Sequence, residues 1–321
     1  MKQFFIFTLF LFCFSGLQSQ VSADSIINNN PSALAIPDLL CDCINQSALK
    51  NPTEKIQPYI EKCLSSTFDT LIAQKKLEEF MADTKKFKDL LTYSKLKLFT
   101  GCEPLVKYQR RYFFLKDSLA LDKMGNPDTK RMFIKGMGLI KSGDYKSAQV
   151  LFLDLVKKDS TFAFAYDNIA LCYKHKNLKD SAMYYLDRSL HFLPENVNAH
   201  LTKAEIYLAK RLIKEAFFEY LKVIEINSSN PEGYFGLGKV FLLNKEYENA
   251  LMNMAYARQM YKILGNEFYK DAVFMTGYIY VQKGDEINAK KYLKESKDLG
   301  FKVPKELVDR YGLVPTGEQK Q

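Results

Sequence analysis

The stretches GMGLIKSGDYKSAQVLF (136–152), ALCYKHKNLKDSAMYYL (170–186) and GKVFLLNKEYENALMNM (238–254) decide the fold, because all three follow one pattern. Each begins with a small residue, has a large apolar residue three positions later and an alanine twelve positions later, and ends on another large apolar residue. Five alanines share this position, the first four 34 residues apart and the last 39 residues beyond the fourth: Ala148, Ala182, Ala216, Ala250 and Ala289. A period of this length, filled by two helical patterns, predicts a helical solenoid.

The small residues explain how the two helices of one repeat can pack closely. Antiparallel helices joined by a short turn approach tightly where a small residue on one faces a small residue on the other, while large side chains fill the gaps alongside. The residues twelve positions before the alanines are all small: Gly136, Ala170, Ala204, Gly238 and Gly277. We therefore expect each alanine to lie at the crossing point of its hairpin.

Turn residues separate these helices at the expected places. Gly143 and Gly284 stand between the two helical patterns of the first and fifth repeats, where glycine allows the positive φ that ends a helix. Pro127, Pro194 and Pro231 stand between repeats, where proline suits the start of a new helix. The longer spacing after the fourth alanine predicts a longer second helix, reaching Ile263, in the fourth repeat.

The pattern resembles that of the tetratricopeptide repeat (TPR) family, over about residues 128–303. The match is most specific in the second and fourth repeats, at Tyr166, Ile169, Ala170, Tyr173, Ala182, Leu186 and Pro194, and at Tyr234, Leu237, Gly238, Phe241, Tyr247, Ala250 and Ala257. Met132, His200 and Val273 replace the first aromatic residue of the family motif in the other repeats, and an apolar one is replaced by Lys135, Lys203 and Thr276. The resemblance implies an all-α solenoid of five hairpins whose first helices line a concave side.

The first 23 residues have the pattern of a secretory signal peptide. Lys2 provides a positive start, residues 4–14 are almost continuously apolar, and Ala23 ends a stretch of small residues suited to cleavage. The alternative is an uncleaved anchor, but the apolar run is shorter than the roughly 20 residues that a membrane span needs. We expect an exported protein, periplasmic, cell-surface or extracellular, with no stable membrane span after signal cleavage.

Four cysteines gather in the N-terminal part of the chain: Cys41, Cys43, Cys63 and Cys102. In an exported protein such a cluster predicts two disulfides. Since Cys41 and Cys43 are too close in sequence to bridge each other comfortably, we expect each to pair with one of the other two. The alternative is a zinc ion held by four thiolates. Cys172, in the repeats, is expected to be buried and inert.

Four segments follow from these patterns: a signal peptide (1–23), an N-terminal helical module with four cysteines (24–126), five TPR-like repeats (127–303), and a C-terminal capping helix with a tail (304–321). Within the N-terminal module we expect one helix that opens at residues 51–54, a second over about 71–99 and a third over about 106–121. Pro58 would kink the first of these helices or move its start. The capping helix, at about 304–311, would cover the last apolar face of the solenoid.

Lysine and arginine number 46 against 37 acidic residues, a formal net charge of +9. A basic excess favours anionic partners, so an adaptor for an anionic envelope component, lipid or glycan, is the alternative function. The competing interpretation is a solvated basic surface, because the lysines are interspersed with acids. An exported protein with dispersed charge is not expected to bind nucleic acid.

Motifs for chemistry are not apparent in the sequence. Its three histidines do not form a metal-ligand pattern with cysteines or carboxylates, and neither H-E-x-x-H nor G-x-S-x-G occurs. The glycine-rich residues 233–238 fall inside a repeat helix, where glycine permits close packing. His200 occupies an aromatic core position, so we expect it to be packed or hydrogen-bonded. We therefore expect no catalytic residue, metal or cofactor, and an enzyme hidden in the N-terminal module is the weakest hypothesis.

The concave side is the expected binding surface, because apolar residues recur there where a solvated helix face should be charged. The expected groove residues are Asp167, Leu171, Lys174, Leu201, Glu205, Leu208, Phe235, Lys239, Leu242, Phe274 and Tyr278, with Phe133, Met137 and Ile140 in the first repeat. Lys174 and Lys239 could anchor a carboxylate. The alternative is that the strip is covered by the N-terminal module, by a second copy or by tight curvature. We predict a non-enzymatic, exported scaffold that binds a protein or peptide partner in this groove.

Overall fold

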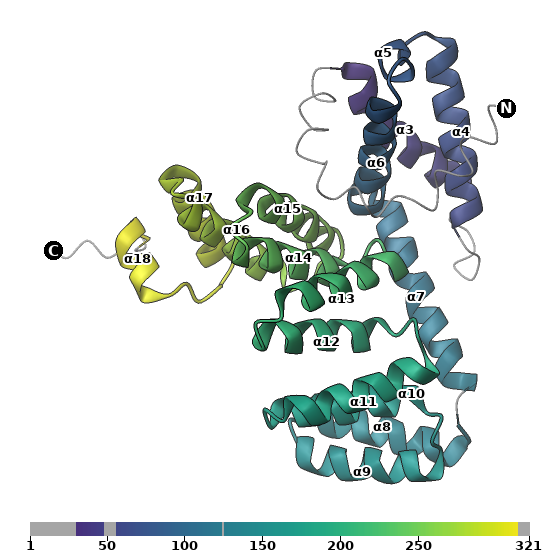
Figure 1. Cartoon of the computed structure of the whole chain (residues 1–321), viewed down its shortest axis with the longest axis vertical. Helices are drawn as coiled ribbons and strands as arrows, with labels where there is room; N and C mark the ends of the chain where they lie inside the picture. The colour runs from purple at the N-terminus through teal and green to yellow at the C-terminus, as the bar shows by residue number, and fades with distance from the viewer. Residues whose placement is uncertain (1–29, 48–55, 124, 314–321) are drawn as a thin grey trace. The chain divides into compact units, whose positions relative to one another are not determined.

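The computed structural model describes residues 30–47, 56–123 and 125–313, and there every regular element is a helix (Figure 1). The expected signal peptide, the helix start at 51–54 and the tail beyond residue 313 lie outside the described residues. The chain divides into two compact units, one ending at Tyr112 and the other beginning at Phe113.

The first unit contains α3 (Pro31–Ser47), α4 (Gln57–Ala73), α5 (Glu78–Met81), α6 (Thr84–Gly101) and the start of α7 (Glu103–Lys123). Pro58 stands in the first turn of α4, so it marks a helix start and makes no kink. The predicted helix over 71–99 is not continuous. Lys75 adopts a positive φ of 57° just beyond α4, and Asp83 caps a new helix by accepting hydrogen bonds from two backbone N–H groups of α6.

Two disulfides cross-link this unit. Cys41 is bonded to Cys102 and Cys43 to Cys63, with Cα–Cα distances of 5.5 and 5.8 Å. The first joins α3 to the residue that ends α6, and the second joins α3 to α4. Each bond of this kind contributes about 2–4 kcal/mol to stability, mainly by restricting the unfolded chain. They reinforce an apolar core that includes Ile36, Leu40, Ile60, Phe80 and Leu98.

The second unit consists of five helical hairpins and a terminal helix. The hairpins are α8 (Pro127–Lys141) with α9 (Tyr145–Lys158), α10 (Ala163–His175) with α11 (Lys179–Phe192), α12 (Val197–Ala209) with α13 (Ile213–Ile226), α14 (Pro231–Leu243) with α15 (Tyr247–Ile263), and α16 (Tyr269–Lys283) with α17 (Glu286–Asp298). The fourth hairpin has the longer second helix that the spacing predicts. After the fifth, α18 (Lys305–Tyr311) follows, and Tyr311 and Leu313 are buried against Ala289 and Leu293.

The unit boundary differs from the one expected at residue 126. It falls inside α7, because the second half of this helix contacts the repeats. Leu121 packs against the apolar cluster of the first two repeats, and Lys116 forms an ion pair with Glu195 at 2.5 Å. A helix can thus be continuous while its two halves belong to different packed units.

The small residues of the motif lie at close helix contacts, but the glycines face the large residue four positions beyond the alanine and not the alanine itself. All five alanines of the motif are completely buried. A Cβ atom added to Gly136 would lie 2.5 Å from the Phe152 ring, and one added to Gly238 would lie 2.6 Å from Met254 Cε. These distances are well below contact distance, so hydrogen in place of a side chain is what permits the helices to approach this closely.

Two glycines of α8 allow the packing argument to be tested on one helix. We predict that Gly136→Ala lowers the free energy of unfolding by about 1–3 kcal/mol, because the new methyl group meets the Phe152 ring. Gly138→Ala is the matched control: its Cβ would meet nothing within 4 Å, so it should stabilise by about 0.5–1 kcal/mol through helix propensity. Urea unfolding followed by circular dichroism measures both. Equal effects of the two substitutions would contradict the close-packing account.

The turns between the helices of each hairpin repeat one backbone conformation. Gly143 and Gly284 have φ of 82°, as the sequence predicts. The equivalent residues in the other three repeats are not glycine, yet Asn177, Arg211 and Lys245 have φ of 58°, 61° and 61°. A left-handed conformation costs an ordinary L-residue about 1–2 kcal/mol, so these turns store a small amount of strain.

Relief of this strain should be measurable. We predict that Arg211→Gly raises the free energy of unfolding by about 0.5–1 kcal/mol, because glycine adopts the left-handed conformation without strain. The greater freedom of glycine in the unfolded chain offsets part of this gain. Gly143→Ala is the converse control and should destabilise, since a Cβ there meets no neighbour and only backbone strain changes. Thermal unfolding by calorimetry compares the two. Destabilisation by Arg211→Gly would show that the Arg211 side chain outweighs its backbone strain.

Candidate binding groove of the repeat stack

The first helices of the hairpins face the inner side of the stack. Successive first helices contact one another, α10 with α12 and α12 with α14, in addition to the contacts that each makes with its own second helix. These three first helices therefore form one continuous layer. The eleven groove residues predicted in repeats two to five all retain some accessible surface: Glu205 is exposed, and the others are intermediate. The structure therefore locates them on one helical layer without burying any of them fully.

Part of the predicted strip is covered by the chain itself. Phe274 stacks on Phe301, which follows the fifth repeat, with ring centroids 4.2 Å apart. In the first repeat, Phe133 lies 5.3 Å from the Phe162 ring and 5.9 Å from the Phe152 ring, so it belongs to the core. On α12 and α14, by contrast, Leu201, Leu208, Phe235 and Leu242 all keep part of their surface accessible.

Lysine and glutamate side chains share this part of the groove. Lys174 of α10 forms an ion pair with Glu205 of α12. The ammonium group of Lys239, on α14, lies 5.4 Å from the centre of the Phe235 ring. Burial lowers the pKa of Lys239, and the nearby Lys174 adds to this effect while Glu205 opposes it. A partly desolvated ammonium group beside an aromatic ring can bind an incoming acceptor oxygen with less loss of hydration than a free lysine.

Asp167 differs from the other predicted groove residues, because its carboxyl group turns inward. The Asn196 amide donates hydrogen bonds to Asp167 Oδ2 and to Ser189 Oγ, the latter at 3.0 Å. Asp167 Oδ1 is buried without a hydrogen-bond partner. Burial raises the pKa of Asp167 to about 7, opposed by hydrogen bonds from Ser189 and Asn196 and assisted by the charge of Asp117. Asp167 thus helps to connect the second and third repeats.

The buried Asp167 should make stability depend on pH. Its pKa is about 7 in the folded protein, against about 3.9 in an unfolded chain, so the folded state retains a proton that the unfolded state releases. The free energy of unfolding should therefore fall as pH rises from about 4 to about 7. We predict that Asp167→Asn removes this component and stabilises the protein by about 1–3 kcal/mol at pH 8. Urea unfolding across this pH range tests it, with Asp298→Asn, an exposed aspartate of α17, as control. A parallel pH profile for both variants would contradict a buried, protonated Asp167.

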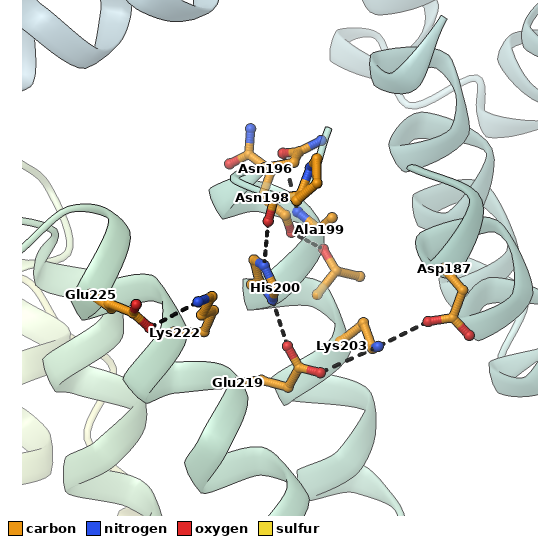
Figure 2. Close-up of polar contacts among 11 residues, drawn as sticks. Asp187, Asn196, Asn198, Ala199, His200, Lys203, Glu219, Lys222 and Glu225 are labelled. Carbon is orange, nitrogen blue, oxygen red and sulfur yellow. Dashed lines mark hydrogen bonds and ion pairs between the residues drawn. The ribbon is translucent and has the colours of Figure 1, made fainter. Parts of the chain in front are cut away.

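A polar network holds α12 in place (Figure 2). His200 is buried, and its ring contacts an acceptor at each nitrogen: Nδ1 lies 2.6 Å from Glu219 Oε2, and Nε2 lies 3.0 Å from the Pro194 carbonyl oxygen. Because both partners are acceptors, only a ring protonated at both nitrogens donates both bonds. The expectation of a packed or hydrogen-bonded His200 is confirmed.

Lys203 extends this network to neighbouring helices. Its ammonium group lies 3.3 Å from Glu219 of α13 and 2.9 Å from Asp187 of α11. Burial by itself raises the pKa of Glu219, but the hydrogen bond from His200 and the charge of Lys203 outweigh it and lower the pKa. Burial by itself lowers the pKa of Lys203, but the two carboxylates, Asp187 and Glu219, outweigh it and raise the pKa. The sequence signal for this site was the lysine at a position where the repeat motif has an apolar residue.

Within residues 30–47, 56–123 and 125–313, histidine, cysteine and acidic side chains do not gather into any group of three suited to a metal ion. Over the same described residues, no helix has both the length and the apolar character needed to cross a membrane.

Comparison with known families agrees with the geometry. The family model described as tetratricopeptide repeat matches residues 271–299, most of the fifth hairpin. The fifth hairpin is thus similar to a tetratricopeptide repeat. A TPR repeat-containing protein of Methanocaldococcus jannaschii is 28% identical over 146 residues, which is 46% of this chain and 25% of that protein. The chain therefore spans about a quarter of the length of this curated relative.

Several solved structures are similar to part of this chain. MamA of Desulfovibrio magneticus RS-1 is 14% identical with a TM-score of 0.47, covering 55% of this chain and 96% of that one. A thermophilic TPR protein of Thermus thermophilus is 17% identical with a TM-score of 0.46, covering 57% and 97%. YrrB, described as a TPR protein with an unusual peptide-binding site, is 18% identical with a TM-score of 0.43, covering 56% and 89%.

Proposed function

We propose that this protein is an exported, non-enzymatic scaffold that binds a segment of another polypeptide along α12 and α14. The observation that supports this most directly is the row of partly accessible apolar side chains on these two helices: Leu201, Leu208, Phe235 and Leu242. A soluble protein rarely leaves such a row in contact with water without a partner. The helices are already folded and packed, so binding does not require the groove to become ordered.

The charges of the groove add directionality to this apolar row. The Lys239 ammonium lies beside Phe235, and Lys174 and Glu205 stand across the neighbouring helices. A bound segment with apolar side chains on one face and a hydrogen-bonding or acidic group near Lys239 would match both features. Specificity would then come from the position of that group, and most of the affinity from apolar burial.

Export is the second part of the proposal. It is supported by the signal-like first 23 residues and by the two disulfides that cross-link the first unit. Disulfides persist in oxidising compartments and are rare in the cytosol. The partner would accordingly be another exported or envelope protein.

An anionic lipid or glycan is the alternative partner, and the net charge of +9 is the observation that favours it. Several lysines of the repeats are, however, already paired with carboxylates, among them Lys174, Lys203, Lys210 and Lys283. Paired lysines contribute little to a long-range attraction for anions. We therefore favour the polypeptide partner.

Site-specific photocrosslinking in the producing cells tests the groove. We predict that a benzoylphenylalanine at Phe235 or Leu242 yields a discrete adduct with another polypeptide, and that Phe235→Asp abolishes the adduct formed from position 242. A crosslinker at Phe218, an exposed residue of α13 outside the groove, is the matched control.

Adducts that form equally from position 218 would contradict groove binding. Groove binding would also be contradicted if neither groove position formed an adduct and the protein cosedimented with phosphatidylglycerol vesicles in a salt-sensitive way. That pair of results would support the anionic partner instead.

A further inference from the structure

The seam between the second and third repeats, where α10–α11 meets α12–α13, is crossed by charged contacts. Three lysine–carboxylate pairs span it: Lys174 with Glu205, Lys203 with Asp187, and Lys210 with Asp180. One pair connects the two first helices at the groove, the second connects α12 with α11, and the third connects Lys210, the residue that follows α12, with α11. Ion pairs thus cross the seam both between the two first helices and between the second repeat's α11 and the third repeat.

Further hydrogen bonds add to these ion pairs. The Asn196 amide, at the start of α12, donates to Asp167 of α10 and to Ser189 of α11. The Lys179 ammonium donates to the carbonyl oxygen of Ala209, at the end of α12, over 3.4 Å. Polar contacts therefore occur at both ends of α12 as well as along its length.

The helices that meet at this seam pack less extensively than those at the next one, since α12 contacts α10 and α11 less than α14 contacts α12 and α13. The buried cluster near the seam consists of Ala170, Ala182, Leu186, Ala199 and Ile206, with Tyr173, Met183, Tyr185 and Leu190 packed against it. The third repeat contributes Ala199 and Ile206 of α12 to this cluster, so little apolar surface interlocks across the seam. Two repeat faces with little interlocking surface can slide or rotate with little loss of packing.

The next seam, between the third and fourth repeats, is packed differently. A Cβ added to Gly233 of α14 would lie 2.8 Å from Ile224 Cγ1 and 3.1 Å from Val223 Cγ1, and one added to Gly236 would lie 2.1 Å from the Tyr220 ring. The backbone of α14 thus rests directly on large side chains of α13. Such a close apolar fit is insensitive to salt and resists sliding.

We propose that the seam between the second and third repeats is a salt-sensitive joint, at which charged contacts set the angle between the first two repeats and the last three. A single exposed ion pair contributes little to stability. Salt weakens it further, because the screening length falls from about 10 Å at 0.1 M salt to about 3 Å at 1 M. Here several act on one seam whose apolar packing is weak, so screening changes the preferred orientation while the hairpins stay folded. The joint is a property of the free protein and does not depend on the proposed partner.

The position of the joint links it to the groove. Lys174 stands on one side of it, and Glu205, Leu201 and Leu208 stand on the other. A change of angle at this seam therefore alters the separation between α10 and α12, while the surface formed by α12 and α14 moves as one body.

Paired spin labels on the full protein test the proposal by electron–electron distance measurement. Tyr184 of α11 and Phe218 of α13 are 61% and 57% exposed, so Tyr184→Cys with Phe218→Cys reports across the joint. Phe218→Cys with Ala255→Cys, on α15, reports across the next seam and is the control. Raising potassium chloride from about 0.05 M to about 1 M should shift the first distance and broaden its distribution about twofold, and leave the second unchanged.

Charge removal gives an independent arm. The variant with Lys174→Met, Lys203→Met and Lys210→Met should show the broad distribution already at low salt, with circular dichroism unchanged. The variant with Lys157→Met, Lys290→Met and Lys294→Met removes the same charge from exposed lysines elsewhere and should keep the narrow one.

An invariant distance across the joint at high salt would overturn the proposal. An equal change at both seams would also overturn it, since that would indicate general loosening of the stack. The salt titration uses the labelled protein with all its lysines. It therefore tests the salt-sensitive joint even if the triple variant at the seam does not fold.

Discussion

The close approach of two helices at a small residue is the constraint on which the repeat unit depends. Where Gly136 meets Phe152, and Gly238 meets Met254, there is no room for even one additional carbon atom. The motif alanine on the second helix is fully buried in all five hairpins. Because the same arrangement recurs in every hairpin, each repeat presents similar faces to its neighbours, and the stack is stabilised by a sum of local contacts. The first unit is stabilised differently, by two disulfides around a small core.

Within this regular frame the third repeat contains a buried polar network. His200 stands where the family motif has an aromatic residue, and Lys203 stands where it has an apolar one. Both would be costly if unpaired in the interior, and both find acceptors: His200 in Glu219 and the Pro194 carbonyl, Lys203 in Glu219 and Asp187. The consequence is that α12, the central helix of the proposed groove, is positioned by directional bonds to α11 and α13. Hydrogen-bonded networks of this kind fix geometry well, but respond to charge and screening in ways that apolar packing does not.

The residues of the expected groove were only partly predictable from the helical period. The period places Leu201, Phe235 and Leu242 on the inner helical layer, and the structure has them there with accessible surface. It assigns Asp167 and Phe274 to the same surface, but the Asp167 carboxyl is turned toward Asn196, and Phe274 is stacked under Phe301. Whether a side chain at a given helical angle stays in the groove depends on partners that are distant in sequence, and a repeat pattern carries no information about them.

The sequence by itself determined the number of hairpins, their boundaries within a few residues, the longer α15, and the glycine turns at Gly143 and Gly284. These features follow from local rules, namely the spacing of small and large side chains, helix capping and backbone conformation, which act over a few residues of chain. Tertiary structure alone decided which cysteines pair, where α7 passes from one unit to the other, and that Asn177, Arg211 and Lys245 adopt the glycine-like turn. It also decided that charged contacts cross the seam between the second and third repeats. Those outcomes depend on contacts between residues far apart in the chain, whose strength is set by burial and distance and becomes defined only when the helices have packed.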